Sequence, residues 1–218
     1  MATAIRNRLK NKRVLVTCGP TWVPLDGVRV ISNLSTGALG NAIACALNKE
    51  GARVTLLQGP VTNALSCRSI KVIKFYFFDE LAKLFERELK KNYPIVIHAA
   101  AVSDYRPSQA INHKISSNFS KLKLTLVPTE KLIEKIKRIS PASFLVGFKL
   151  ESQSAKNMLL AKSRNLFKKS HCDLVVANTV AKNSYRGYLI DGKSRVLAEA
   201  QSRTAMSQKL IKALKERV

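Results

Sequence analysis

The chain has 218 residues and a strongly basic composition, with 38 Lys and Arg against 14 Asp and Glu and a formal net charge of +24. Because 46% of the residues are hydrophobic, a wholly disordered basic protein is excluded, and the length fits one folded domain. No apolar run approaches the roughly 18 residues of a membrane span, and residues 1–13 lack the apolar core of a secretory signal.

The first half of the chain alternates short β-branched runs with longer segments of helical period. This alternation is typical of parallel strands joined by crossover helices. A long loop containing Gly, Pro and Ser, residues 18–35, follows the first strand. The patterns predict strands at 13–17, 53–57, 70–75 and 95–98, and helices at 37–50 and 79–91.

The second half is less regular. Residues 121–127 (KLKLTLV) alternate polar and apolar side chains, which predicts an antiparallel or edge strand. Asp191-Gly192 lies between two short β runs, 188–190 and 195–197, and predicts a hairpin turn. The other predicted elements are helices at 128 to about 139, 154–170 and 204–216, and strands at 143–148 and 173–177.

Together these elements predict a Rossmann-like three-layer α/β sandwich with a mostly parallel sheet and a small protruding antiparallel element. We expect one domain at 13–218, preceded by a basic tail at 1–12. The four cysteines form no C-x-x-C pair, so neither a zinc site nor a disulfide framework is expected, and a reducing cytoplasmic location fits best. They are Cys18, Cys45, Cys67 and Cys172.

The first predicted strand leads into a candidate phosphate site. Ligands of open α/β sheets bind beyond the carboxyl ends of strands. Ser35 and Gly37 stand where a helix begins, and its free N–H groups would attract phosphate; a close helix–sheet contact would also explain Gly37 and Gly40. A nicotinamide site is not indicated, because neither G-x-G-x-x-G nor Tyr-x-x-x-Lys is present.

The fourth predicted strand ends at His98 and leads into a second candidate loop. Its small residues 99–101 would let a flat ligand lie against the backbone. Asp104 is a candidate for a metal or a ligand N–H, and Lys114 for a phosphoryl oxygen, although a structural role for each stays open. His98 follows an apolar strand and is expected to be a core histidine and not a base.

The two loops and four further segments resemble the phosphopantothenate–cysteine ligases (phosphopantothenoylcysteine synthetases) of coenzyme A biosynthesis, in their stand-alone form. These enzymes join 4′-phosphopantothenate to L-cysteine through an acyl-nucleotide. The similarity runs in the family's order over residues 14–178. The segments are GPTWVPLDGVRVISNLSTGALG, GARVTLLQGP, HAAAVSDYRP, HKISS, LVGFKLES and DLVVAN.

The resemblance assigns roles by position. Asn33 matches a residue that handles the acyl intermediate, Arg29 matches an arginine nearby, and Lys114 matches the catalytic lysine of a flexible flap. The flap reads Lys114-Ile115-Ser116-Ser117, as in the eukaryotic-like branch. The implied nucleotide-binding residues are Ser35, Gly37, Ala99, Ala100, Ala101, Asp104, Lys114, Pro128, Thr129, Glu130, Lys131, Phe148, Lys162 and Lys169, with Lys168 as an alternative to Lys169.

The same resemblance implies CTP, with ATP as the alternative, and Mg²⁺ held mainly by phosphates. It implies no flavin, so a separate protein would carry out decarboxylation, and a homodimer paired through 186–198 or 114–127. No membrane partner is expected. Two other functions stay open: a basic nucleic-acid-binding α/β module, suggested by the net charge, and a ligase homologue that has lost its activity.

Overall fold

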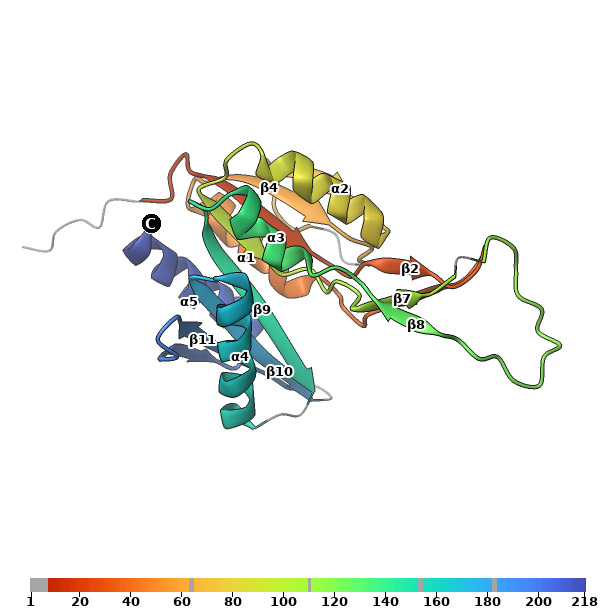
Figure 1. Cartoon of the computed structure of the whole chain (residues 1–218). Coiled ribbons are helices and arrows are strands. Elements are labelled where there is room, and N and C mark those ends of the chain that lie inside the picture. Colours follow the sequence, from red (N-terminus) through yellow and green to blue (C-terminus); the bar gives the residue numbers. More distant parts are fainter. Residues whose placement is uncertain (1–7, 63–64, 110, 153–154, 182–183) are drawn as a thin grey trace, which may run out of the picture.

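The computed structural model describes residues 8–62, 65–109, 111–152, 155–181 and 184–218. Within them, eight strands form one sheet (Figure 1). In spatial order these are β12 (Val196–Ala200), β11 (Ser184–Asp191), β10 (Leu174–Ala181), β9 (Phe144–Ser152), β6 (Ile95–His98), β1 (Arg13–Cys18), β4 (Arg53–Gln58) and β5 (Lys71–Lys74). The helices are α1 (Ala38–Lys49), α2 (Phe78–Leu89), α3 (Leu132–Ile139), α4 (Lys156–Ser170) and α5 (Arg203–Arg217).

The sheet is mostly parallel, as the sequence predicts. Neighbouring strands from β5 to β10 pair in parallel, whereas β10–β11 and β11–β12 pair antiparallel. The β11–β12 ribbon turns at Asp191, whose carboxylate accepts hydrogen bonds from the backbone N–H groups of Lys193 and Arg195. The predicted hairpin is therefore confirmed.

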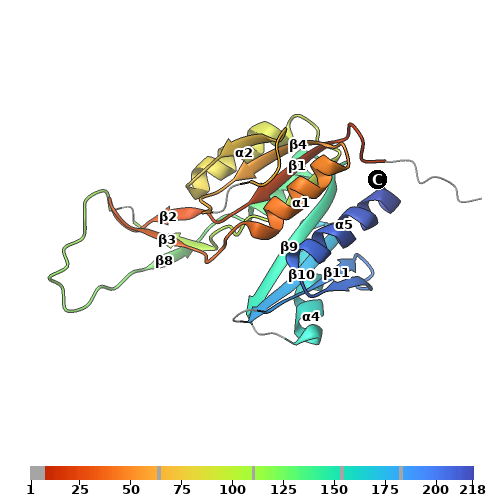
Figure 2. The same ribbon diagram turned by 180° about the vertical axis from the view of Figure 1, so that it is seen from behind.

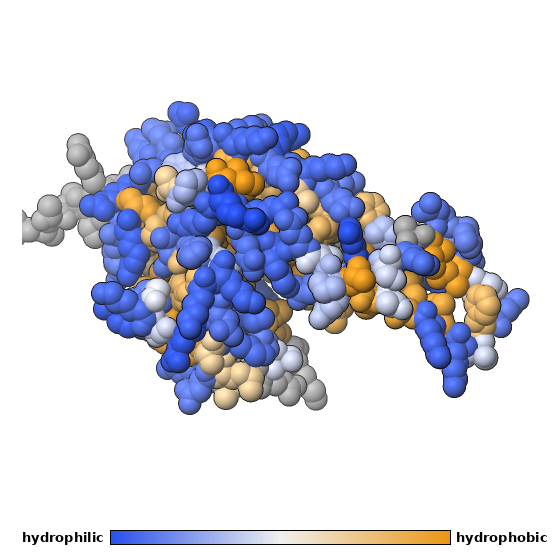
Figure 3. All heavy atoms as spheres, in the orientation of Figure 1, coloured by the Kyte–Doolittle hydropathy of each residue, from blue (hydrophilic) through white to orange (hydrophobic). Residues whose placement is uncertain are grey.

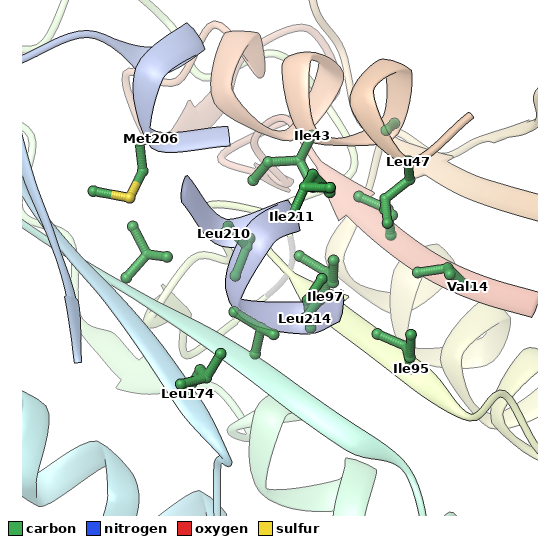
Figure 4. Packing of buried hydrophobic residues seen from close by; sticks show 14 of the residues in the cluster. Val14, Ile43, Leu47, Ile95, Ile97, Leu174, Met206, Leu210, Ile211 and Leu214 are labelled. Atoms are coloured by element: carbon green, nitrogen blue, oxygen red, sulfur yellow. The ribbon is translucent and has the colours of Figure 1, made fainter. Parts of the chain in front are cut away.

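Helices cover both faces of the sheet, and the alternation along each strand decides which side chains they meet. Val14 and Val16 of β1 pack with α1 and α5, which lie side by side on one face (Figures 2 and 4). Leu15, between them, packs with α2 and α3 on the other face. Since burying one such side chain stabilises the fold by about 1.5–3 kcal/mol, the two cores hold the three layers together.

A narrow element, which we call the arm, extends away from the sandwich (Figures 1 and 2). It contains the antiparallel pairs β2 (Trp22–Pro24) with β3 (Val30–Ser32) and β7 (Tyr105–Pro107) with β8 (Leu126–Pro128), and the described residues between β7 and β8. The predicted loop 18–35 thus contains two strands. The predicted strand 121–127 is wrong over 121–125, because β7 offers only three residues for pairing.

Two cysteines and part of the predicted N-terminal tail differ from the prediction, because the cysteines pair and Leu9 of the tail is buried. Cys45 of α1 and Cys67 form a disulfide, so the prediction that the cysteines do not pair is wrong for these two; their Cα atoms lie 5.5 Å apart. Leu9 is fully buried against the α1–α5 core, while residues 1–7 of the predicted tail lie outside the described residues. None of the described helices has the length and apolar character needed to cross a bilayer.

Candidate active site

The loops after β1 and β6 lie side by side at the carboxyl edge of the sheet. The backbone N–H of Ala101 donates to the Gly19 carbonyl at 2.9 Å, and that of Thr21 donates to the Ala101 carbonyl at 3.3 Å. From β1 the chain continues to β4 on one side, whereas β6 is followed by β9 on the other. Such a switch point leaves a crevice between the loops, where ligands of open α/β sheets bind.

Asn33 joins these two loops. Its side-chain nitrogen donates to the backbone carbonyls of Ala101 and Val102, each at 3.1 Å. Because both N–H groups are used in this way, the amide oxygen is the group that Asn33 can present to a ligand. The structure therefore places Asn33 in contact with the predicted residue Ala101, at the end of the 99–101 segment.

Gly37 and Gly40 begin α1 next to the same crevice. Gly37 has a φ of 68°, and a Cβ on Gly40 would lie 2.3 Å from Cβ of Cys18. Only a glycine fits at position 40, so the close contact between α1 and β1, which the sequence analysis kept as an alternative explanation, accounts for Gly40. The N–H groups of Gly37 and Ala38 donate to the hydroxyls of Ser35 and Thr36, each at 3.4 Å. Because the first turn of α1 contains no acidic residue, no carboxylate neutralises the positive end of the helix beside Ser35.

A cleft of about 460 Å³ opens on the α3–α4 side of the crevice. Seven residues predicted to bind nucleotide line it together: Ala100, Asp104, Glu130, Lys131, Phe148, Lys162 and Lys169. Further lining residues that the sequence did not single out for a ligand include Lys149, Asn165, Leu166 and Ser170. The cleft has apolar walls and a mainly cationic rim, a combination that suits a ring carrying phosphates.

Ion pairs hold the charged side chains around this cleft. Glu151 lies between Lys162 at 2.6 Å and Lys149 at 3.2 Å, and the hydrogen bond from Lys162 is the largest cause of the lowered pKa of Glu151. Asp104 pairs with Lys131. In the described part of the chain, no three His, Cys, Asp or Glu side chains gather as a metal site, so the predicted metal role of Asp104 gains no support.

Pro128 and Thr129 lie at the base of the arm, outside the lining of the cleft. Thr129 Oγ1 donates to the Ser103 carbonyl, and the Thr129 N–H donates to the Asp104 carbonyl at 2.9 Å. These contacts fix the chain that leads from β8 into α3. Thr129 is 8% exposed, so it supports the loop more than it offers a surface for a ligand.

Arg29 and Lys114 lie on the arm, where one buried carboxylate connects two segments. Asp26 accepts hydrogen bonds from the N–H groups of Val28 and Arg29 and, 89 residues away, of Ile115. Arg29 pairs with Asp26 at 3.1 Å and donates to the Ile115 carbonyl at 2.6 Å. Arg29 is therefore held beside the exposed Lys114. Burial by itself raises the pKa of Asp26. The hydrogen bonds from these N–H groups and the charge of Arg29 together have a larger, opposite effect, so the pKa lies below its usual range.

His98 is a core residue, as predicted. It is 7% exposed, its Nδ1 lies 2.9 Å from Thr17 Oγ1, and burial lowers its pKa to about 4. Thr17 Oγ1 also accepts a hydrogen bond from the Ala100 N–H at 3.1 Å. Through Thr17, this neutral histidine supports the loop that borders the crevice, and it is also one of the residues that line the cleft.

The fold and the crevice define an α/β protein with a cleft at the carboxyl edge of its mostly parallel sheet. Residues 9–217 match the family described as DNA/pantothenate metabolism flavoprotein C-terminal domain, and the chain belongs to this family.

Similar curated proteins come from several organisms. The coenzyme A biosynthesis bifunctional protein CoaBC of Thermococcus kodakarensis is 39% identical over 173 residues, covering 79% of this chain and 42% of its own length. The protein of the same description from Borreliella burgdorferi is 30% identical over 214 residues, covering 96% and 54%. The chain thus spans about half the length of the curated relatives it matches.

Solved structures share the fold. The DNA/pantothenate metabolism flavoprotein from Streptococcus pneumoniae has a TM-score of 0.84 at 26% identity, over 95% of this chain and 100% of that chain. A Cab2 mutant in complex with phosphopantothenate-cysteine has a TM-score of 0.77 at 20% identity, over 95% and 87%. The second likeness supports the fold alone.

Proposed function

We propose that this protein ligates 4′-phosphopantothenate with L-cysteine in coenzyme A biosynthesis, using a nucleoside triphosphate. Membership of the family and the coenzyme A descriptions of the relatives support the pathway. The observation that carries the site assignment is Asn33, fixed between the two strand-end loops beside a cleft that is lined by seven of the predicted nucleotide-binding residues.

The reaction has two steps. A carboxylate oxygen of phosphopantothenate forms a bond to the α-phosphorus of the nucleotide, and pyrophosphate leaves. The amine of cysteine then forms the amide bond with the acyl carbon, the nucleoside monophosphate leaves, and the amine releases a proton. The cleft holds the base against Phe148, and the phosphates extend toward Ser35 and Gly37 at the start of α1.

Residues of the arm neutralise the negative charge of the two substrates. The carboxylate and the triphosphate repel each other, and Arg29 and Lys114 supply positive charge as they meet. Asn33 offers its amide oxygen to the amine of cysteine, which orients the attack on the acyl carbon. We propose CTP as the nucleotide. The phosphates of the nucleotide would hold Mg²⁺, which would neutralise part of their charge.

We further propose that the active form is a homodimer paired through the arm. The arm exposes Phe119, Leu122 and Leu124 by 63%, 47% and 41%, and Figure 3 shows hydrophobic side chains gathered there against a mostly hydrophilic surface. Exposed apolar side chains in one place are typical of a contact with another chain. Decarboxylation of the product is assigned to a separate protein.

The test separates the two half-reactions in three variants. In Asn33→Asp, the new carboxylate is repelled by the carbonyls of Ala101 and Val102, so pyrophosphate release persists while amide formation falls roughly 10²–10³-fold. Lys114→Ala lowers both, and Lys209→Ala, at an exposed lysine of α5 on the other face of the sheet, changes neither. Full ligase activity of Asn33→Asp and Lys114→Ala would refute the residue roles. Absence of either half-reaction in the unmodified protein would indicate a homologue that has lost its activity.

A further inference from the structure

One hydroxyl in the cleft has no hydrogen-bond partner. Ser170, the last residue of α4, lines the cleft and is 1% exposed. Its Oγ is one of two buried side-chain polar atoms without a partner in the described part of the chain. The other is the hydroxyl of Tyr185, which belongs to the α1–α5 core on the opposite face of the sheet.

The position of Ser170 on a helix makes this lack of a partner unusual. A serine in a helix commonly donates to the carbonyl four residues earlier. Ser163 of the same helix does so: it is fully buried, and its Oγ donates to the Leu159 carbonyl at 2.7 Å. Ser170 does not make the corresponding bond, so its hydroxyl is left for something that enters the cleft.

A buried hydroxyl without a partner destabilises a protein, and such groups occur where a ligand supplies the missing bond. The surroundings of Ser170 indicate which part of a ligand this is. Phe148, Leu166 and Ile133 give the cleft apolar side chains suited to a flat ring, whereas Lys131 and Lys169 are exposed and suit phosphates or solvent. Ser170 shares this cleft with the apolar side chains, so the polar edge of a ring bound against them is the group that its hydroxyl would meet.

We propose that Ser170 hydrogen-bonds the base of the bound nucleoside triphosphate and so sets which base the enzyme prefers. This inference rests on the proposed function of the same cleft. A site built to hydrogen-bond a substrate discriminates against analogues that leave its polar group unpaired. The bond adds affinity in both ground and transition states, so its loss raises KM while kcat is retained.

The first experiment measures Kd by calorimetry and steady-state kinetics for CTP, ATP, UTP and GTP. Ser170→Ala is expected to weaken the preferred nucleotide roughly tenfold in Kd and KM, with the others changed less than twofold. Ser163→Ala, which changes an already bonded hydroxyl on the same helix, is expected to keep the preference. Equal affinities of the original protein and Ser170→Ala for every nucleotide, or an equal loss for all of them, would overturn the proposal.

The second experiment measures thermal unfolding without ligand. If Ser170 waits for a ligand, Ser170→Ala removes an unsatisfied group and raises Tm by roughly 2–4 °C, as Tyr185→Phe does on the opposite face. Only Ser170→Ala alters nucleotide preference. A lower Tm for Ser170→Ala would show that the hydroxyl has a structural partner and contradict the proposal. Pyrophosphate release with an unchanged preference would refute this inference and leave the proposed function intact.

Discussion

Individual polar residues connect loops that lie far apart in the sequence, and their protonation states follow from burial. Thr17 Oγ1 contacts both His98 Nδ1 and the Ala100 N–H, 81 and 83 residues away. Since burial lowers the pKa of His98 to about 4, this connection uses the neutral ring. The titration of His98 should therefore make the stability of the protein depend on pH.

We predict that His98 makes the protein less stable as the pH falls from about 6.5 to about 4. In this window the unfolded chain binds a proton at His98 and the folded chain does not, so stability falls by roughly 1.4 kcal/mol per pH unit. Above pH 6.5 the contribution is fully present. Urea unfolding across the window checks this against His98→Asn, whose amide oxygen can accept the hydrogen bond from the Thr17 hydroxyl and which does not titrate. Identical pH slopes of the two proteins would contradict it.

How far single residues can be predicted from sequence depends on where their partners lie. His98 was predictable as a core residue because the apolar strand before it is local. Asp26 was not, since one of its partners, Ile115, is 89 residues away. Ser170 was missed because the absence of a bond leaves no sequence pattern. The positions of Asn33 and Lys114 followed from family motifs, and their roles stay predictions.

At the scale of elements, the sandwich and the presence of a small protruding antiparallel element were predictable, but the strands that form the arm were not. Buried strands such as β1 and β6 are marked by local apolar runs that match the observed bounds within one residue. The alternation at 121–127 predicted a longer strand, but alternation gives no information about the length of the partner, and β7 spans only three residues. The Cys45–Cys67 disulfide was likewise missed, because a 22-residue separation does not report proximity in the fold.

The connection between the β2–β3 turn and the arm leads to a prediction for activity. Asp26→Asn removes the negative charge that pairs with Arg29 and one of the oxygens that bind Val28, Arg29 and Ile115. We expect kcat to fall roughly 10- to 100-fold, because Lys114 beside Ile115 loses its position. Tm is expected to fall as well, because the fold stabilises the ionised carboxylate of Asp26. Asp79→Asn, at a carboxylate that is 74% exposed, is the control. An unchanged kcat in Asp26→Asn would rule out this positioning role.

The whole molecule combines a net charge of +24 with an apolar arm. The positive charge would attract anionic substrates such as a triphosphate and a phosphorylated acid from solution. This attraction would weaken as the salt concentration rises. The arm carries apolar side chains that are exposed to solvent in the isolated protomer. Pairing of two arms would cover these side chains and hold Lys114 in a defined position.

We predict that the double variant Leu122→Ser, Leu124→Ser dissociates the dimer, because it removes apolar area from the proposed contact. Light scattering is expected to give about twice 24.2 kDa for the original protein and 24.2 kDa for the variant. Leu150→Ser, at a leucine that is 53% exposed on the sandwich, should remain dimeric. A dimer of unchanged strength in the double variant would place the contact elsewhere, as at 186–198.

The most direct measurement is pyrophosphate release from CTP or ATP when cysteine is left out. A protein that converts the pantothenate carboxylate into an acyl-nucleotide should release about one pyrophosphate per active site, only when phosphopantothenate is present, and mass spectrometry should detect the acyl-nucleotide. Adding cysteine should then release the nucleoside monophosphate together with the amide. Release that does not depend on phosphopantothenate, or inorganic phosphate in place of pyrophosphate, would contradict the account.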